Sequence, residues 1–235
     1  MGFVVNFFTV GGPAQTVLVA ATQLNLTLLS AASSVGRVLL VDGSPIPCEP
    51  MRAICERLQV EYLHAGRELS YVEAYNLGIQ TLKNPFIGLI ANDVVPHPID
   101  SLDRLYDWIQ RERVGCAFPY IATSRTRGDE VQTPGFARRG SVTCEPASFA
   151  LNLAVFRRDV LERIDLLDER FRAGYQEPIL LLKIRNLGYR AVLVGGTRAL
   201  HLDQLTKLFK ESHIDGKCAK VRPATRHVVG TALVP

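Results

Sequence analysis

The stretch Pro85–Pro96, PFIGLIANDVVP, decides the fold of this chain. The apolar run over residues 86–90 predicts a buried strand, and that strand stops abruptly at Asn92 and Asp93, with proline following at Pro96. In open α/β sheets, ligands bind beyond the carboxyl ends of the strands. The stretch therefore predicts a binding site at this edge of a sheet, where Asp93 can hold a divalent metal ion.

Strands and helices alternate on both sides of this stretch. Before it, the apolar pattern predicts strands over 3–8, 37–41 and 60–63 and helices over 16–32, 50–58 and 70–82. After it, the pattern predicts helices over 99–111, 159–163 and 178–187 and strands over 114–119, 149–156 and 189–194. Short connections between alternating elements are typical of an α/β fold with a mostly parallel central sheet flanked by helices. Pro178 suits the first position of its helix, which makes Glu177 the expected cap.

Length and composition are consistent with one domain. The chain has 235 residues, 47% of them hydrophobic and 21% charged, enough to bury one large core. The net charge is +4 and the pI is about 8.9. This mildly basic balance suits an anionic ligand, but it falls short of the basic stripe of a dedicated nucleic-acid binder.

The cysteines and the N-terminal segment indicate a cytoplasmic protein. The five cysteines are odd in number and form no Cys-x-x-Cys pair, which is typical of reduced thiols. No charged residue or histidine precedes Arg37, yet Gly11-Gly12-Pro13 interrupts the apolar run. A membrane span needs about 20 unbroken apolar residues, and a signal peptide needs a basic start. We therefore expect no transmembrane segment.

Four segments carry a resemblance to a known family. They are VLLVDGS at 38–44, SYVEAYNLG at 70–78, FIGLIANDVVPHP at 86–98 and LLDERFRAGYQEPILLLKIRNLGY at 166–189. Their order and spacing resemble those of family 2 glycosyltransferases. The resemblance implies a GT-A type nucleotide-diphospho-sugar transferase fold and a single catalytic domain over 1–235. It divides that domain into a nucleotide-binding half at 1–98, an acceptor half at 99–201 and a basic tail or lid at 202–235.

The same resemblance implies an activity and a donor site. The activity is inverting transfer of a sugar from a nucleotide-diphosphate sugar to an acceptor hydroxyl or similar nucleophile. Asp42 would lie against the base or ribose, where a carboxylate accepts hydrogen bonds, and Asn76 and Gly78 would face the nucleotide. Two structural alternatives remain open: Asp42 could cap the turn that follows it, and Gly78 could be a packing glycine.

The family resemblance also implies a metal site for Mn²⁺ or Mg²⁺. Asp93 matches the last acidic residue of the family's Asp-x-Asp motif, and His201 matches a histidine that completes the site. The alternatives are that Asp93 only starts a surface turn and that His201 is a surface or packing residue. The first Asp is replaced by Ala91, and Asn92 offers only a neutral oxygen. We therefore expect weak metal affinity unless the donor diphosphate supplies further oxygen ligands.

Glu177 is the candidate catalytic base. The family usually has an acidic pair here, whereas this chain has Tyr175-Gln176-Glu177. In an inverting displacement, a carboxylate on the acceptor side must take the proton of the acceptor. The alternative is that Glu177 only caps its helix. Basic residues could also close over the leaving diphosphate, namely Arg125, Arg127, Arg138, Arg139, Lys207, Lys210 and Lys217.

Two other functional classes remain open. The altered acidic residues favour a catalytically inactive nucleotide-sugar binding protein. A nucleotidyltransferase shares the broad architecture, but its Gly-rich loop normally carries a basic residue that Gly11-Gly12-Pro13 lacks. The acceptor is also open among a glycan, a protein and a modified nucleic-acid base.

Overall fold

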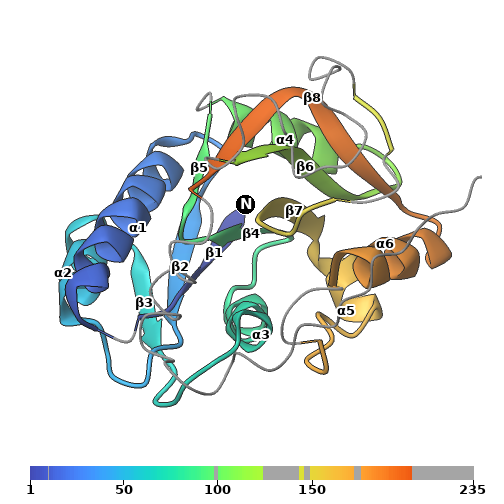
Figure 1. Cartoon of the computed structure of the whole chain (residues 1–235). Helices are drawn as coiled ribbons and strands as arrows, with labels where there is room; N and C mark the ends of the chain where they lie inside the picture. The colour runs from blue at the N-terminus through green and yellow to red at the C-terminus, as the bar shows by residue number, and fades with distance from the viewer. Residues whose placement is uncertain (10, 98–99, 124–142, 146–148, 172–175, 203–235) are drawn as a thin grey trace, which may run out of the picture.

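The computed structural model describes residues 1–9, 11–97, 100–123, 143–145, 149–171 and 176–202 (Figure 1). The first half contains β1 (Gly2–Phe7), α1 (Pro13–Ala31), β2 (Arg37–Asp42), α2 (Glu49–Arg57), β3 (Glu61–His64), α3 (Tyr71–Thr81), β4 (Phe86–Ala91) and β5 (Val94–Pro96). The second half contains α4 (Ser101–Ile109), β6 (Val114–Thr123), β7 (Leu153–Arg157), α5 (Arg158–Arg163), α6 (Gln176–Asn186) and β8 (Arg190–His201). Within these ranges, no helix is long and apolar enough to cross a bilayer.

One curled sheet runs through both halves in the order β3-β2-β1-β4-β7-β6-β8-β5. Strands β3, β2, β1 and β4 are parallel, so their carboxyl ends share one edge. Strand β7 is antiparallel to both β4 and β6, while β6 and β8 are parallel. The short β5 closes the order by pairing antiparallel with β8. The last strand in the described part of the chain, β8, therefore pairs with the strand that follows β4.

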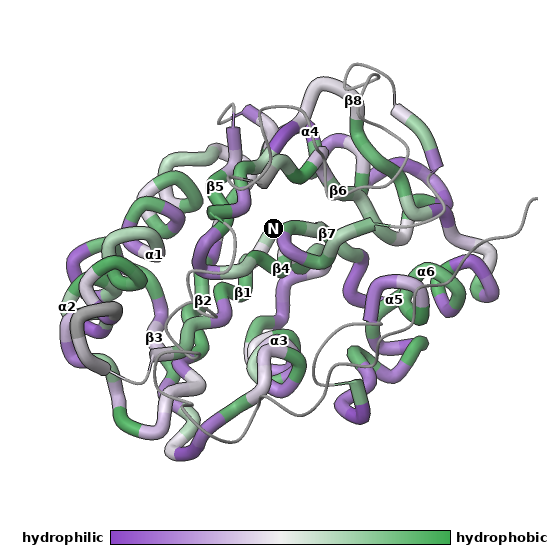
Figure 2. The backbone as a smooth tube through the Cα atoms, viewed as in Figure 1, coloured by the Kyte–Doolittle hydropathy of each residue, from purple (hydrophilic) through white to green (hydrophobic). Residues whose placement is uncertain are grey.

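The sheet is covered on both faces. Side chains of α1, α2 and α4 form one core with Phe3, Val5 and Phe7 of β1. Side chains of α3, α5 and α6 form the other core, with Val4 of β1 among its members. Successive side chains of a strand point to opposite faces, which explains this division. Figure 2 shows that both α1 and α3 contain hydrophobic and hydrophilic residues.

Most predicted elements are confirmed, but several boundaries are wrong. Helix α1 begins at Pro13 rather than at residue 16, and strand β6 continues to Thr123 rather than ending at residue 119. Helix α6 begins at Gln176 rather than Pro178, so Glu177 lies inside the first turn and is not the cap. Strand β8 continues to His201 instead of ending at residue 194. The apolar pattern breaks at Gly195 and Gly196, but the strand extends past them. The predicted strand over 149–156 begins only at Leu153.

Strand β5 was not predicted. Its three residues end in Pro96, and proline argues against a central strand. Proline is tolerated here because β5 lies at the edge of the sheet.

Candidate functional site

The turn between β4 and β5 carries Asn92 and Asp93, and both residues are only 5% exposed. Strand β5 pairs with the end of β8 so that Val94 lies opposite His201. This pairing places Nε2 of His201 3.4 Å from Oδ1 of Asp93. The structure thus brings together the two residues that were predicted as metal ligands, although they are 108 positions apart in the sequence. The side-chain nitrogen Nδ2 of Asn92 is buried without a hydrogen-bond partner among the described residues.

Asn152 holds the other side of the His201 ring. Its Nδ2 lies 2.8 Å from Nδ1 of His201, and its backbone oxygen accepts a hydrogen bond from the backbone N–H of Ala91 at 2.9 Å. Because Nδ2 is a donor, Nδ1 of His201 accepts in this arrangement, and the proton of a neutral ring is then on Nε2, facing Asp93. With its amide turned over, Asn152 would instead accept from Nδ1–H through Oδ1 and leave Nε2 available to a metal ion, which is how outer hydrogen bonds orient metal-binding histidines. Sequence reasoning missed Asn152. Its only signal was a polar residue inside the apolar run over 149–156.

Glu177 lies in the first turn of α6, where its Oε1 accepts a hydrogen bond from the backbone N–H of Leu151 at 3.3 Å. The buried phenol of Tyr75 of α3 is influenced by the charges of both this carboxylate and Asp93. Burial raises the pKa of the Tyr75 phenol, and the charges of Asp93, Tyr71 and Glu177 raise it further. Both carboxylates are therefore within electrostatic range of one phenol. The role of Glu177 as a base remains a prediction.

The contacts of Gln176 explain why this position carries an amide rather than the acid that the family resemblance predicts. It is fully buried, and its Nε2 donates hydrogen bonds to the backbone oxygens of Asp168 and Phe171, the second at 3.0 Å. An ionised carboxylate has no proton to donate and would face two carbonyl oxygens. Gln176 therefore ties the segment before α6 to the helix start. Asp168 is itself paired with Arg170.

Asp42 ends β2, and its carboxylate is fully buried. It accepts hydrogen bonds from the backbone N–H groups of Ser44 at 2.9 Å and Cys48 at 3.0 Å, and from the hydroxyl of Tyr62. Burial raises the pKa of Tyr62 above its ordinary value, and the hydrogen bond to Asp42 raises it further, so this phenol stays a donor. These bonds are those of a residue that caps the turn after β2. The predicted contact with a base or ribose is a separate use of Asp42 that remains a prediction.

Asn76 and Gly78 make structural contacts in α3. The side chain of Asn76 exchanges two hydrogen bonds with the backbone of Leu167, at 2.9 and 3.0 Å. A Cβ atom on Gly78 would lie 2.2 Å from Cγ1 of Val4, so glycine lets α3 pack directly on β1. Gly78 is therefore a packing glycine, which is the structural alternative given above. Contact of either residue with a nucleotide remains a prediction.

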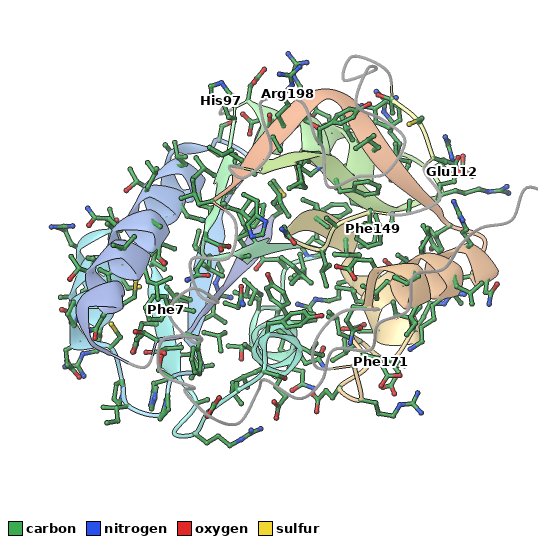
Figure 3. All side chains as sticks on the ribbon, in the orientation of Figure 1. Phe7, His97, Glu112, Phe149, Phe171 and Arg198 are labelled. Atoms are coloured by element: carbon green, nitrogen blue, oxygen red, sulfur yellow. The ribbon has the colours of Figure 1, made fainter. Side chains whose placement is uncertain are left out.

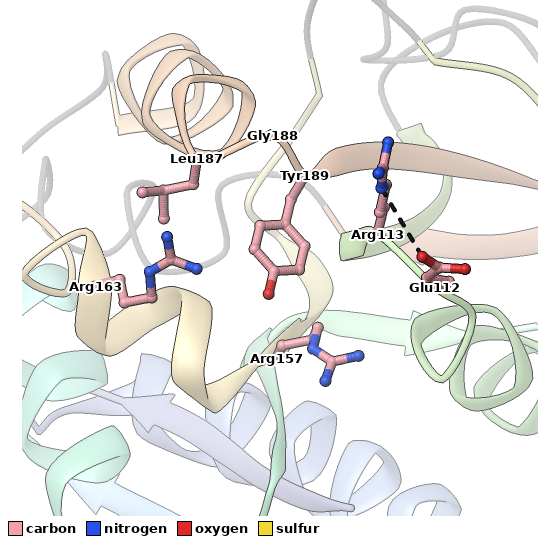
Figure 4. Close-up of a pocket in the computed structure, with 7 residues that line it drawn as sticks. All are labelled: Glu112, Arg113, Arg157, Arg163, Leu187, Gly188 and Tyr189. Carbon is pink, nitrogen blue, oxygen red and sulfur yellow. Dashed lines mark ion pairs between the residues drawn. The ribbon is translucent and has the colours of Figure 1, made fainter.

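A pocket of about 580 Å³ lies away from Asp93 and His201 (Figure 4). It is lined by Glu112, Arg113, Arg157, Arg163, Leu187, Gly188 and Tyr189. Arg157 pairs with Phe86 at the start of β4, so the pocket is at the sheet edge opposite Asp93. Arg163 lies in the last turn of α5, where a cation complements the negative end of the helix dipole. Arg157 pairs with Asp159, and Arg113 pairs with Glu112. The arginines therefore have a structural explanation, and Glu112 is at the periphery of the molecule (Figure 3).

Several predicted residues lie outside the described part of the chain. They are Arg125, Arg127, Arg138, Arg139, Tyr175, Lys207, Lys210 and Lys217, together with the tail or lid beyond 202. In the part that is described, no cluster of three or more His, Cys, Asp or Glu side chains could hold a metal ion. Asp93 and His201 lie together as a pair, and their role as cation ligands remains a prediction.

Comparison with known proteins gives similar structures without similar sequences. No family model and no curated protein matches the chain. The structure resembles a mannosyltransferase from Pyrobaculum calidifontis solved with GDP-Man and Mn²⁺, with a TM-score of 0.61 and 16% identity over 85% of this chain and 55% of that one. It also resembles GalNAc-T7 solved with UDP, GalNAc and Mn²⁺, with a TM-score of 0.63 and 15% identity over 85% of this chain and 43% of that one. The fold is that of GT-A glycosyltransferases.

This result confirms the predicted fold class. The chain spans about half the length of these neighbours, whose identities of 15 to 16% are evidence for the fold alone. Membership of family 2 in particular remains a prediction, since no family model matches.

Proposed function

We propose that this chain is a metal-dependent, inverting glycosyltransferase that takes its sugar from a nucleotide-diphosphate donor. The observation that carries the proposal is the pair formed by buried Asp93 and partly buried His201, whose side chains lie 3.4 Å apart beyond the carboxyl end of β4 in a GT-A fold. Both neighbouring structures were solved with a nucleotide or nucleotide sugar and Mn²⁺. A carboxylate and an imidazole are suitable ligands for such an ion.

The donor set fits a divalent cation that is only partly held by protein. Mg²⁺ and Mn²⁺ sites in phosphate-transferring proteins often use one or two protein ligands and take the rest from phosphate and water. When bound here, the cation would neutralise charge on the leaving diphosphate. Asp93 and His201 would hold it, and Asn152 would keep the imidazole oriented. This arrangement predicts weak binding of the metal alone and stronger binding of metal with nucleotide.

Glu177 is proposed to take the acceptor proton. The acceptor oxygen attacks the anomeric carbon as the bond to the diphosphate oxygen breaks, and the diphosphate leaves with the electron pair. The acceptor proton passes to the carboxylate of Glu177. Its Oε1 is already oriented by the backbone of Leu151. The acceptor class, whether a glycan, a protein or a modified nucleic-acid base, stays open.

Two substitutions test the roles separately. Asp93→Ala is expected to abolish metal-dependent turnover, while Asp107→Ala, at an exposed position of α4, is the control that leaves turnover unchanged. Glu177→Gln is expected to leave donor binding intact and to slow transfer by about 10²- to 10⁴-fold. Full activity in either site variant would remove that residue from the mechanism.

An inactive nucleotide-sugar binding protein is the second candidate. It is favoured by the amide at Gln176 and by the two-residue cation set, both of which depart from the expected acidic pattern. Metal-dependent nucleotide binding without hydrolysis or transfer of any donor sugar would support this candidate over the enzyme.

A further inference from the structure

Asn25 is a buried polar residue in the middle of α1. Its side chain is fully buried, and its Nδ2 donates hydrogen bonds to the backbone oxygens of Ala91 at 3.0 Å and Val94 at 2.6 Å. Ala91 is the last residue of β4 and Val94 is the first residue of β5. The two acceptors therefore lie on either side of Asn92 and Asp93.

Only a carboxamide suits this position. Its single nitrogen carries two N–H groups, so one side chain can hold both ends of the turn at once. Leucine has a similar size but no donor, and an aspartate carboxylate would direct charge at two carbonyl oxygens. Asn25 is the only side chain recorded as donating to these two carbonyls in the described part of the chain.

Keeping Asn25 at this position is locally unfavourable. Its Oδ1 is buried without a hydrogen-bond partner among the described residues, which costs about 1–3 kcal/mol. Asparagine also has a lower helix propensity than leucine, by about 0.5 kcal/mol. Neighbours such as Leu26 and Leu29 belong to the apolar core, so an apolar residue would be the ordinary choice. What Asn25 provides in return is control of the turn that carries the candidate cation ligand.

We propose that Asn25 is a positioning residue, which fixes the Asn92–Asp93 turn so that Asp93 meets His201 and the donor diphosphate. This inference rests on the proposed function. The rest of the turn is tied by the backbone N–H of Ala91 to Asn152 and by the backbone oxygen of Asp93 to Leu202. Without Asn25 the oxygens of Ala91 and Val94 lose their side-chain donor, and the carboxylate of Asp93 shifts. Binding sites need their groups held within about 0.5 Å, so such a shift weakens binding.

Binding of Mn²⁺ in the presence of UDP or GDP tests the inference directly. The loss of the free Mn²⁺ signal in electron paramagnetic resonance, measured against the same nucleotide without protein, gives the dissociation constant without any need for turnover. Asn25→Leu is expected to raise this constant at least 10-fold while the circular dichroism spectrum keeps its wild-type form. The matched control is Thr22→Val, which lies one turn earlier in α1, is equally buried and bonds only within the helix to Leu18. The control is expected to stay within 2-fold of wild type.

The outcomes are distinguishable. If wild type binds Mn²⁺ with nucleotide and Asn25→Leu binds it equally well, Asn25 has no positioning role, although the proposed function stands. If wild type itself binds no Mn²⁺ with either nucleotide, the proposed function fails and the inference fails with it. Should Asn25→Leu not fold, Asn25→Ala removes the same two donors without adding apolar bulk and is judged by the same criterion.

Discussion

Gly78→Ala is a test of how closely α3 lies on β1. A Cβ atom at this position would lie 2.2, 2.8 and 3.1 Å from side-chain atoms of Val4. Ordinary carbon–carbon contacts are about 3.5–4.0 Å, so one of the two elements must move by more than about 1 Å. Val4 is fully buried, and its β-branched side chain has few alternative rotamers, so it cannot move aside easily.

The two effects of the substitution oppose each other. Alanine is favoured over glycine in a helix by about 1 kcal/mol, whereas overpacking in a core costs about 1–3 kcal/mol. Because the closest contact lies far inside the normal separation, we place the overpacking cost at the upper end and expect a net loss of about 2 kcal/mol. For a chain of this size, that loss lowers the melting temperature by about 4–8 °C.

Urea unfolding of a double-mutant cycle with Val4→Ala makes the prediction sharp. Val4→Ala alone removes two buried methyl groups and should cost about 2 kcal/mol. If the clash is the cause, the smaller side chain relieves it, and the double variant loses about 1–2 kcal/mol in total. Independent effects would instead add to about 4 kcal/mol. Additivity, or a Gly78→Ala protein as stable as wild type, would refute the packing role of Gly78.

Three further substitutions follow from the buried polar contacts. Hydrogen bonds from the backbone N–H and hydroxyl of Ser70, and then Arg67, lower the pKa of Glu73 to about 2. Glu73→Gln should therefore cost about 1 kcal/mol in urea unfolding at pH 7, and the difference should disappear as the pH falls from 4.5 towards 2. Gln176→Glu should lower the free energy of unfolding by about 3–5 kcal/mol at pH 7, because a buried charge replaces two donated hydrogen bonds. Acidification should restore part of this stability, whereas wild-type stability at pH 7 would contradict the prediction. Tyr62→Phe should cost about 1–2 kcal/mol by calorimetry, since buried Asp42 loses one donor, whereas an unchanged melting temperature would mean that the bond contributes nothing.

Much of the fold could be predicted because its signals are local. The apolar runs at β1, β2 and β4 and the Ser70 cap of α3 identify elements through neighbouring residues alone. Strand β5 has no such signal: its three residues form a strand only because β8 returns to pair with them. The end of β8 was missed for the same reason, since pairing with β5 and β6 extends it beyond its apolar part.

The site was predictable in part. Asp93 stands out because a charged residue ends an apolar strand, and the family resemblance then pointed to His201. Asn25 and Asn152 could not be predicted as parts of the site, since their contacts join segments 66 and 49 positions apart. In the sequence, Asn152 is a single polar interruption of an apolar run, whereas Asn25 is one of several polar residues in its segment. Their meaning depends on which backbone groups the fold places against them.

The measurement to make first is nucleotide binding with and without Mn²⁺, compared between wild type and Asp93→Ala. Wild type and Asp93→Ala would be titrated by calorimetry with UDP, GDP and TDP, each with and without Mn²⁺. The pair Asp93 and His201 predicts that one nucleotide binds wild type at least 10-fold more tightly with Mn²⁺ than without it, and that Asp93→Ala removes the metal effect. Equal binding with and without Mn²⁺, or an unchanged metal effect in Asp93→Ala, would contradict a cation site at the end of β4.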